Sequence, residues 1–236
     1  MRKVFLIAIN HLRDQRWILL TMFGYVLFMS TVMGVIVHRP NYQDASFFVE
    51  QQMWFSVLFS MFLATSAVNT DMRTRRMQAI LSKAVERWQY LLGILVGITM
   101  AITSYCIVVG VLGLILSNRA GHALSGIFQL GGCVLIVALA VESVGLFFGL
   151  LLPPIFATTA TVGFLTTVPL LTIRGPSWLN HFGPVAWLAT QTVQQFNTGH
   201  APQIRNTLVE NVVYAAIVFC LALAVFNHRD LARATE

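Results

Sequence analysis

Long apolar runs separated by short polar segments dominate this chain. Each run is about 16 to 27 residues long, and about 20 apolar residues are enough to cross the hydrocarbon core of a bilayer. The runs therefore predict six membrane-spanning helices, at 17–37, 53–68, 90–116, 126–152, 155–173 and 208–226. The first run is longer than the core of a signal peptide and has no small-residue cleavage site after it, so we expect it to be retained as a span.

The residues before the first span predict a separate short helix. Within 1–16, the apolar residues Val4, Phe5, Ala8 and Ile9 fall near one helical face, and the charged residues lie largely elsewhere. This pattern is typical of an amphipathic helix that lies in the membrane interface. A basic tail without such a role is the alternative.

Composition agrees with lipid as the solvent. Of the 236 residues, 57% are hydrophobic and 10% are charged, whereas an ordinary soluble domain carries about 25% charged residues. We therefore expect an all-α membrane protein with one transmembrane domain over 1–236. The basic residues lie at the ends of apolar runs and form no stripe with interleaved aromatics, which argues against a nucleic-acid partner. The three cysteines have no metal-type spacing, so we expect no metal site.

The distribution of basic residues predicts the orientation. Loops alternate between the two sides of the membrane, and eleven of the 15 lysines and arginines fall on one side. The positive-inside rule assigns that side, with both termini and the loop 69–89, to the cytoplasm. The segment 174–206 is then external, and the chain is expected to be a multi-pass protein of the cell's inner (plasma) membrane. Only Pro153 and Pro154 separate the fourth and fifth spans, which predicts a tight hairpin there.

The loop 69–89 carries the most informative pattern in the chain. It contains Ile80-Leu81-Ser82-Lys83, followed by Val85, Arg87 and the helix start Tyr90-Leu91-Leu92-Gly93. It resembles the first cytoplasmic loop of type-two ABC exporter permeases, including the copper-enzyme-maturation and uncharacterised ABC permease group. The pattern departs from that family at Ala84, where proline is usual, and at Glu86, where serine is usual.

The resemblance implies a six-helix permease subunit that pairs with a second permease copy, as a homodimer or a heterodimer. Each unit would dock on a separate cytosolic ABC ATPase, which would bind ATP and magnesium and drive cargo outward. No Walker-type phosphate loop occurs in the chain, so we expect no catalytic site and no cofactor on it. The residues expected to couple to the ATPase are Asp71, Arg73, Arg75, Arg76, Ile80, Leu81, Ser82, Lys83, Arg87 and Trp88.

Two other interpretations of these features stay open. The arginines of the loop would fix topology and bind anionic headgroups of membrane lipid in any polytopic protein. A channel or a membrane scaffold without ATP coupling would explain the spans equally well. An intramembrane enzyme is disfavoured, because Glu142 is the only deep ionisable group and catalysis needs a converging set.

Polar and small residues inside the spans are the remaining candidates. Glu142 either contacts cargo or a proton on the translocation path, or packs as a protonated or hydrogen-bonded residue. The pairs Gly93/Gly97 and Gly145/Gly149 allow close helix packing, within one chain or across a dimer. Threonines of the fifth span either line a conduit or bond to their own helix backbone. They are Thr158, Thr159, Thr161, Thr166 and Thr167.

Overall fold

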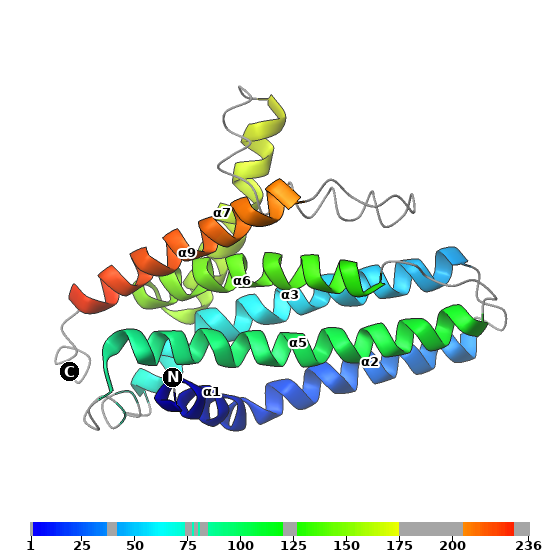
Figure 1. The fold of residues 1–236 in the computed structure, drawn as a ribbon, viewed down its shortest axis with the longest axis horizontal. Helices are drawn as coiled ribbons and strands as arrows, with labels where there is room; N and C mark the ends of the chain where they lie inside the picture. Colours follow the sequence, from blue (N-terminus) through cyan, green and yellow to red (C-terminus); the bar gives the residue numbers. More distant parts are fainter. Residues whose placement is uncertain are drawn as a thin grey trace.

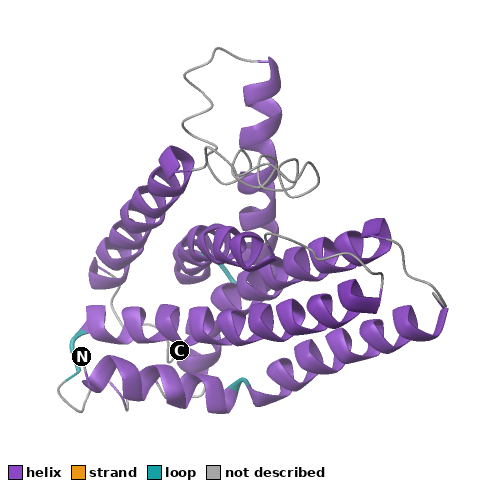
Figure 2. Ribbon diagram, turned by 45° about the vertical axis from the view of Figure 1, so that its right-hand side comes forward, coloured by secondary structure: helices purple, strands orange, loops and turns teal. Residues whose placement is uncertain are grey.

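The computed structural model describes residues 2–36, 42–73, 77, 80, 85–119, 127–174 and 205–228. Within these residues the chain forms seven helices and no strand (Figures 1 and 2), which confirms the all-α prediction. The helices are α1 (Arg2–Asp14), α2 (Arg16–Ile36), α3 (Tyr42–Arg73), α5 (Arg87–Arg119), α6 (Ile127–Leu151), α7 (Pro154–Arg174) and α9 (Arg205–His228).

Five of the predicted spans are helices that are long and apolar enough to cross a membrane. These are Arg16–Val35, Ser46–Met72, Arg87–Leu116, Ile127–Leu151 and Leu208–His228. The predicted fifth span, 155–173, coincides with the 21-residue helix α7. Its segment Pro154–Leu165 is apolar but shorter than a crossing requires, and the side chains after it lie outside the described set. The sixth crossing therefore stays a prediction, as do the external segment 174–206 and the sidedness of the membrane.

Helix α3 is much longer than the predicted 53–68, because polar residues at its beginning find partners inside the protein. The side chain of Gln52 is fully buried, and the Tyr105 hydroxyl of α5 donates to its Oε1 at 3.0 Å. This bond satisfies the amide oxygen, while the buried Nε2 of Gln52 has no hydrogen-bond partner among the described atoms. The hydropathy pattern could not show this pairing, since it weighs Gln52 as if it faced lipid.

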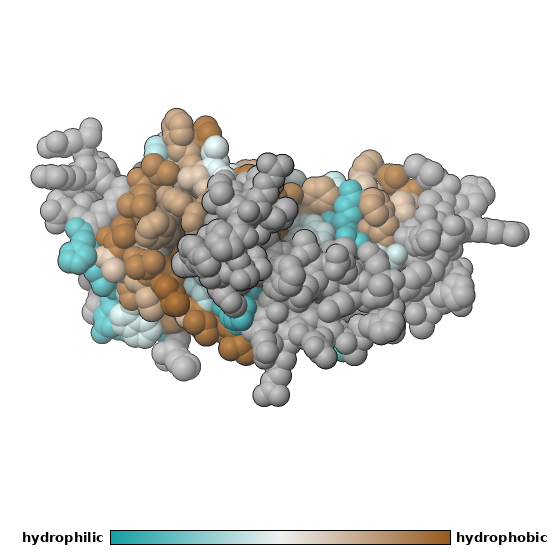
Figure 3. Space-filling view, turned by 90° about the horizontal axis from the view of Figure 1, so that it is seen from above, coloured by the Kyte–Doolittle hydropathy of each residue, from teal (hydrophilic) through white to brown (hydrophobic). Residues whose placement is uncertain are grey.

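Helix α6 occupies the centre of the bundle. In its most apolar 18-residue window, 67% of the residues are buried, compared with 11% in α2 and 17% in α9. It contacts α3, α5, α7 and α9. The outer helices instead expose apolar side chains such as Phe28 of α2 and Ile217 of α9. The face seen from above carries a continuous hydrophobic band over the part where α9 lies (Figure 3). Such a surface suits contact with lipid.

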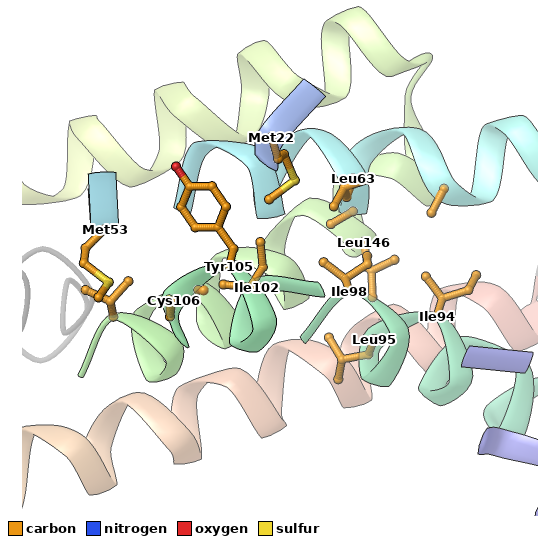
Figure 4. Packing of buried hydrophobic residues seen from close by; sticks show 14 of the residues in the cluster. Met22, Met53, Leu63, Ile94, Leu95, Ile98, Ile102, Tyr105, Cys106 and Leu146 are labelled. Atoms are coloured by element: carbon orange, nitrogen blue, oxygen red, sulfur yellow. The ribbon is translucent and has the colours of Figure 1, made fainter. Parts of the chain in front are cut away.

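The core between the inner helices is built from aliphatic and sulfur-containing side chains. Ile98 and Ile102 of α5 lie together with Leu63 of α3, Leu146 of α6 and Met22 of α2 (Figure 4). All five are almost fully buried. The core therefore joins four helices into one unit.

Both glycine pairs serve packing within the chain. A Cβ added at Gly149 would lie 2.9 Å from the backbone oxygen of Thr65, and one at Gly145 would lie 3.0 Å from the Cβ of Ala64. Glycine at these positions lets α6 approach α3 closely. The interpretation as close packing within one chain is confirmed for this pair.

The other glycine pair holds the N-terminal helix. A Cβ added at Gly93 would lie 2.7 Å from Cγ2 of Ile7, and one at Gly97 would lie 3.1 Å from the backbone oxygen of Ala8. Contacts thus advance in the same direction along both helices, so α1 runs beside the first turns of α5. Phe5 on the other side of α1 stays exposed. The predicted separate helix is present, docked lengthwise on α5, with an apolar face left for lipid.

The connection between α6 and α7 is as short as Pro153 and Pro154 predict, since α6 ends at Leu151 and α7 begins at Pro154. Proline suits the first position of a helix, where its missing N–H has no acceptor to reach. The prediction of a hairpin is wrong in direction, however. Helix α7 rises steeply away from the end of α6 instead of returning along it (Figures 1 and 2). Its described side chains pack on the bundle through contacts such as Phe148 with Phe164, at 6.1 Å between ring centroids.

Candidate functional site

The ends of α3, α5, α6 and α9 meet at one end of the bundle, where the polar segment after α3 begins and ends (Figure 1). We call the residues that tie them together the helix-end junction. They are Asn69, Asp71, Arg87, Tyr90 and Phe226.

Arg87 joins the beginning of α5 to the end of α9. Its guanidinium donates to the backbone oxygens of Phe226 at 3.1 Å and Asn227 at 2.6 Å. The last carbonyls of a helix have no partner within the helix, and a cation there also meets the negative end of the helix dipole. The guanidinium lies 6.0 Å from the ring centroid of Phe226, within range of a cation–π contact. Arg87 therefore caps α9.

Tyr90 connects the same point to α3. Its hydroxyl donates to Oδ2 of Asp71 at 2.7 Å, and its ring stacks on Phe226 with centroids 5.9 Å apart. Asp71 is 5% exposed and Tyr90 is 0% exposed, so this bond is shielded from water. A hydrogen bond to a carboxylate is stronger than a neutral one. One tyrosine thus links three helices.

Asn69 connects α3 to the end of α6. Its Nδ2 donates to the backbone oxygens of Gly149 at 2.9 Å and Leu152 at 3.1 Å. These carbonyls belong to the last turn of α6 and the residue after it, where an amide side chain replaces the missing helical donors. Asn69 was the first residue of the predicted loop 69–89. In the structure α3 continues through Asn69 to Arg73 and α5 begins at Arg87, so the connection between the two helices is shorter than predicted.

The structure describes the side chains of four of the ten expected coupling residues. Asp71 and Arg87 are engaged within the chain, as above. Ile80 is partly buried against the core of the same chain. Trp88 is 42% exposed, and its indole N–H donates to the carboxylate of Glu86. Among the residues expected to couple, Arg73 is described for its backbone alone, and five lie outside the described residues: Arg75, Arg76, Leu81, Ser82 and Lys83.

Glu142 lies inside the bundle and is 0% exposed. Its Oε2 is 2.9 Å from the Thr99 hydroxyl of α5, and the same hydroxyl is 2.9 Å from the backbone oxygen of Leu95. Its Oε1 has no hydrogen-bond partner among the described atoms. Both sequence interpretations of Glu142 remain open, and the structure adds Thr99 as its neighbour.

The threonines of α7 bond mainly to their own helix. The hydroxyls of Thr158, Thr159 and Thr161 donate to the backbone oxygens four residues earlier, at 2.7 to 3.0 Å. Backbone bonding is thus confirmed for these three, while the side chains of Thr166 and Thr167 lie outside the described set. Thr158 also lies 2.9 Å from the Thr65 hydroxyl, which fastens α7 to α3.

Reasoning from the sequence missed Asn69, Tyr90 and Thr99 as contributors. Tyr90 stands in the Tyr-Leu-Leu-Gly helix start, but its partner Asp71 was assigned to the ATPase contact. The position of Thr99 along its helix is a signal that could have identified it. It lies twelve residues after the beginning of α5, and Glu142 lies nine residues before the end of the neighbouring α6, so both lie at a similar distance from the helix-end junction. No comparable signal identifies Asn69.

Neither comparison with known proteins nor a search for metal-binding side chains assigns a further role to these residues. No protein-family model matches the chain, and no curated protein matches it either. Within the described residues, no group of three or more histidine, cysteine, aspartate or glutamate side chains could hold a metal ion.

Proposed function

We propose that the chain is the membrane-spanning permease subunit of an ATP-driven ABC exporter in the inner membrane. It pairs with a second permease copy and couples to a separate cytosolic ATPase, which binds ATP and magnesium and drives cargo outward. The resemblance of the segment around Ile80-Leu81-Ser82-Lys83 to type-two ABC exporter permeases supports this proposal. The architecture supports it through the helix-end junction.

The observation that carries the proposal is the attachment of both ends of the 74–86 segment. The helix before it, α3, is bonded to α6 through Asn69 and to α5 through Asp71. The helix after it, α5, is bonded to α9 through Arg87. A force applied to this segment would therefore act on four helices together. Packed helices shift between discrete arrangements, so a small rotation at such a point can reach the far end of the bundle.

The shared position of the helix ends supports the expected topology. The start of α1 and the end of α9 lie at the end of the bundle that also holds the junction (Figure 1). An even number of crossings, as in the proposed six-span topology, would bring these ends to one side. It fits two cytoplasmic termini on the same side as the coupling segment.

The test is recovery of the ATPase with the tagged chain, purified from its native cells in nanodiscs and analysed by mass spectrometry. The coupling variant is Arg75→Gln/Lys83→Gln. Arg87 is left unchanged, because its loss would loosen α9. The control variant, Arg39→Gln/Arg119→Gln, removes the same charge from the opposite side of the predicted topology.

The proposal expects a soluble ATPase with a phosphate-binding loop to copurify with the wild type and the control, and to fall at least tenfold with the coupling variant. Both variants must elute as folded protein at the wild-type position. Absence of any ATPase from the wild type would overturn the proposal in favour of a channel or scaffold. Equal loss of the ATPase from both variants would show that Arg75 and Lys83 do not form the contact with it.

A further inference from the structure

The Glu142 carboxyl occupies a costly position for a charge. It is 0% exposed, and it lies nine residues before the end of the 25-residue helix α6, which places it about 14 Å along the axis from that end. An ionised carboxylate inside a bilayer costs several kcal/mol unless water or a cation compensates it. The contacts around Glu142 decide which form it takes.

Its hydrogen-bond partners do not suit an ionised carboxylate. Such a group accepts through both oxygens at about four sites, yet Oε2 meets a single hydroxyl and Oε1 meets no donor among the described atoms. The Thr99 hydroxyl also lies 2.9 Å from two acceptor oxygens, Glu142 Oε2 and the Leu95 carbonyl, but it has one proton. The hydroxyl either shares its one proton between the two oxygens in a weaker three-centre bond, or donates it to Leu95 and accepts a proton from a neutral Glu142, which makes both contacts full hydrogen bonds.

No cation from the neighbouring helices lies at this level within the described residues. Contacts of Gly145 with Ala64 place Glu142 beside the stretch of α3 around Met61. Asp71 lies ten residues further along α3, and Arg87 lies twelve residues before Thr99 on α5, so each is about 15 Å or more away along the axis. Glu142 is the only charged residue of α6.

The remaining titratable and charged groups on the helices around α6 do not compensate it either. Tyrosine and cysteine side chains supply no positive charge, and Glu50 and Glu210 are themselves acidic. His228 is the last residue of α9, beside the helix-end junction. On α7, the described side chains include no titratable group. The groups on α3, α5 and α9 with described side chains are Glu50, Asp71, Arg87, Tyr90, Tyr105, Cys106, Glu210, Tyr214, Cys220 and His228.

We propose that Glu142 is a proton-binding site within the membrane. In the packed bundle the neutral acid donates to Thr99, and the carboxyl releases its proton to water only when α5 and α6 move apart. The step is a simple exchange, in which the O–H bond breaks, the electron pair stays on the carboxylate and the proton goes to water. This inference does not rest on the exporter proposal, because it concerns the chain alone.

The first test is infrared difference spectroscopy of the full chain in nanodiscs at pH 7, wild type minus Glu142→Gln. Glutamine keeps the shape and can still donate to Thr99, so the variant should fold. We expect the carbonyl absorption of a protonated carboxyl in the difference spectrum, shifted by Thr99→Val because its hydrogen bond is lost. A difference spectrum with the bands of an ionised carboxylate alone would overturn the proposal.

The second test measures unfolding in mixed micelles between pH 5 and pH 8. A carboxyl in water has lost its proton above about pH 5, so unfolding then releases the Glu142 proton. The unfolding equilibrium constant of the wild type should rise about tenfold per pH unit relative to Glu142→Gln. The ratio of the wild type to Glu210→Gln, a change on the exposed side of α9 that keeps Glu142, should stay constant with pH. A constant ratio between wild type and Glu142→Gln across this range would overturn the proposal.

Discussion

Replacing Gly149 with alanine will force α3 and α6 apart. The added Cβ would lie 2.9 Å from the backbone oxygen of Thr65, 3.3 Å from its Cα and 3.4 Å from the backbone oxygen of Ala64. All three atoms belong to the α3 backbone, which cannot turn aside as a flexible side chain would. The helices must therefore separate by a few tenths of an ångström along their contact.

The matched control is Gly132→Ala on the same helix. An added Cβ there meets no atom within 4 Å, so the change keeps only the gain in helix propensity, about 1 kcal/mol. Gly149→Ala has the same gain and in addition an overpacking penalty of about 1–3 kcal/mol. The difference between the two variants isolates that penalty. It corresponds to roughly a 5- to 150-fold difference in the unfolding equilibrium.

The assay is equilibrium unfolding in mixed micelles, followed by circular dichroism, with the wild type and both variants at one detergent composition. We expect Gly132→Ala to equal or exceed the wild type in stability, and Gly149→Ala to fall below Gly132→Ala by the amount above. Equal stability of the two variants would refute the reasoning, because α3 and α6 could not then lie as close as the structure places them.

Three further predictions address the junction and the outer face. Arg87→Ala should speed amide hydrogen exchange in the last turn of α9, where two carbonyls lose a charged donor; exposed Trp88→Ala should leave those amides unchanged. Asn69→Ala should lower stability by about 1–2 kcal/mol in the same micelle assay, because two carbonyls at the end of α6 lose their donor. In the folded protein a lipophilic maleimide should label exposed Cys220 and leave buried Cys106 unlabelled. Mass spectrometry reads this out, and faster labelling of Cys106 would contradict the packing.

The spans could be predicted from the sequence because lipid imposes one dominant requirement. A run of apolar residues has few other uses, and the five helices that are long and apolar enough to cross a membrane follow from it. The Pro153-Pro154 break has the same local origin, since proline ends one helix and begins another. No local rule fixes the direction of α7 after that break.

The junction could not be predicted, because most of its acceptors are backbone carbonyls. Every helix end offers such carbonyls, and only the tertiary arrangement decides that Arg87 reaches the end of α9 and Asn69 the end of α6. The charge of Arg87 was explained equally well by topology or by an acidic partner. A side chain that bonds to a backbone carbonyl needs no partner residue of a particular type. A search of the sequence for residues of opposite charge therefore cannot find such a contact.

The lengths of α3 and α5 bear on where the junction lies. Helices α3 and α5 have 32 and 33 residues, which makes each about 50 Å long, whereas the hydrocarbon core is about 30 Å thick. Each helix can therefore project beyond the lipid. The junction lies at the last residues of α3 and the first of α5, and α1 flanks the neighbouring turns of α5 through Gly93 and Gly97. Because Asp71, Tyr90 and Arg87 tie the ends of α3 and α5 to α9, the three helices are braced together at this end of the bundle, as the proposed coupling would require.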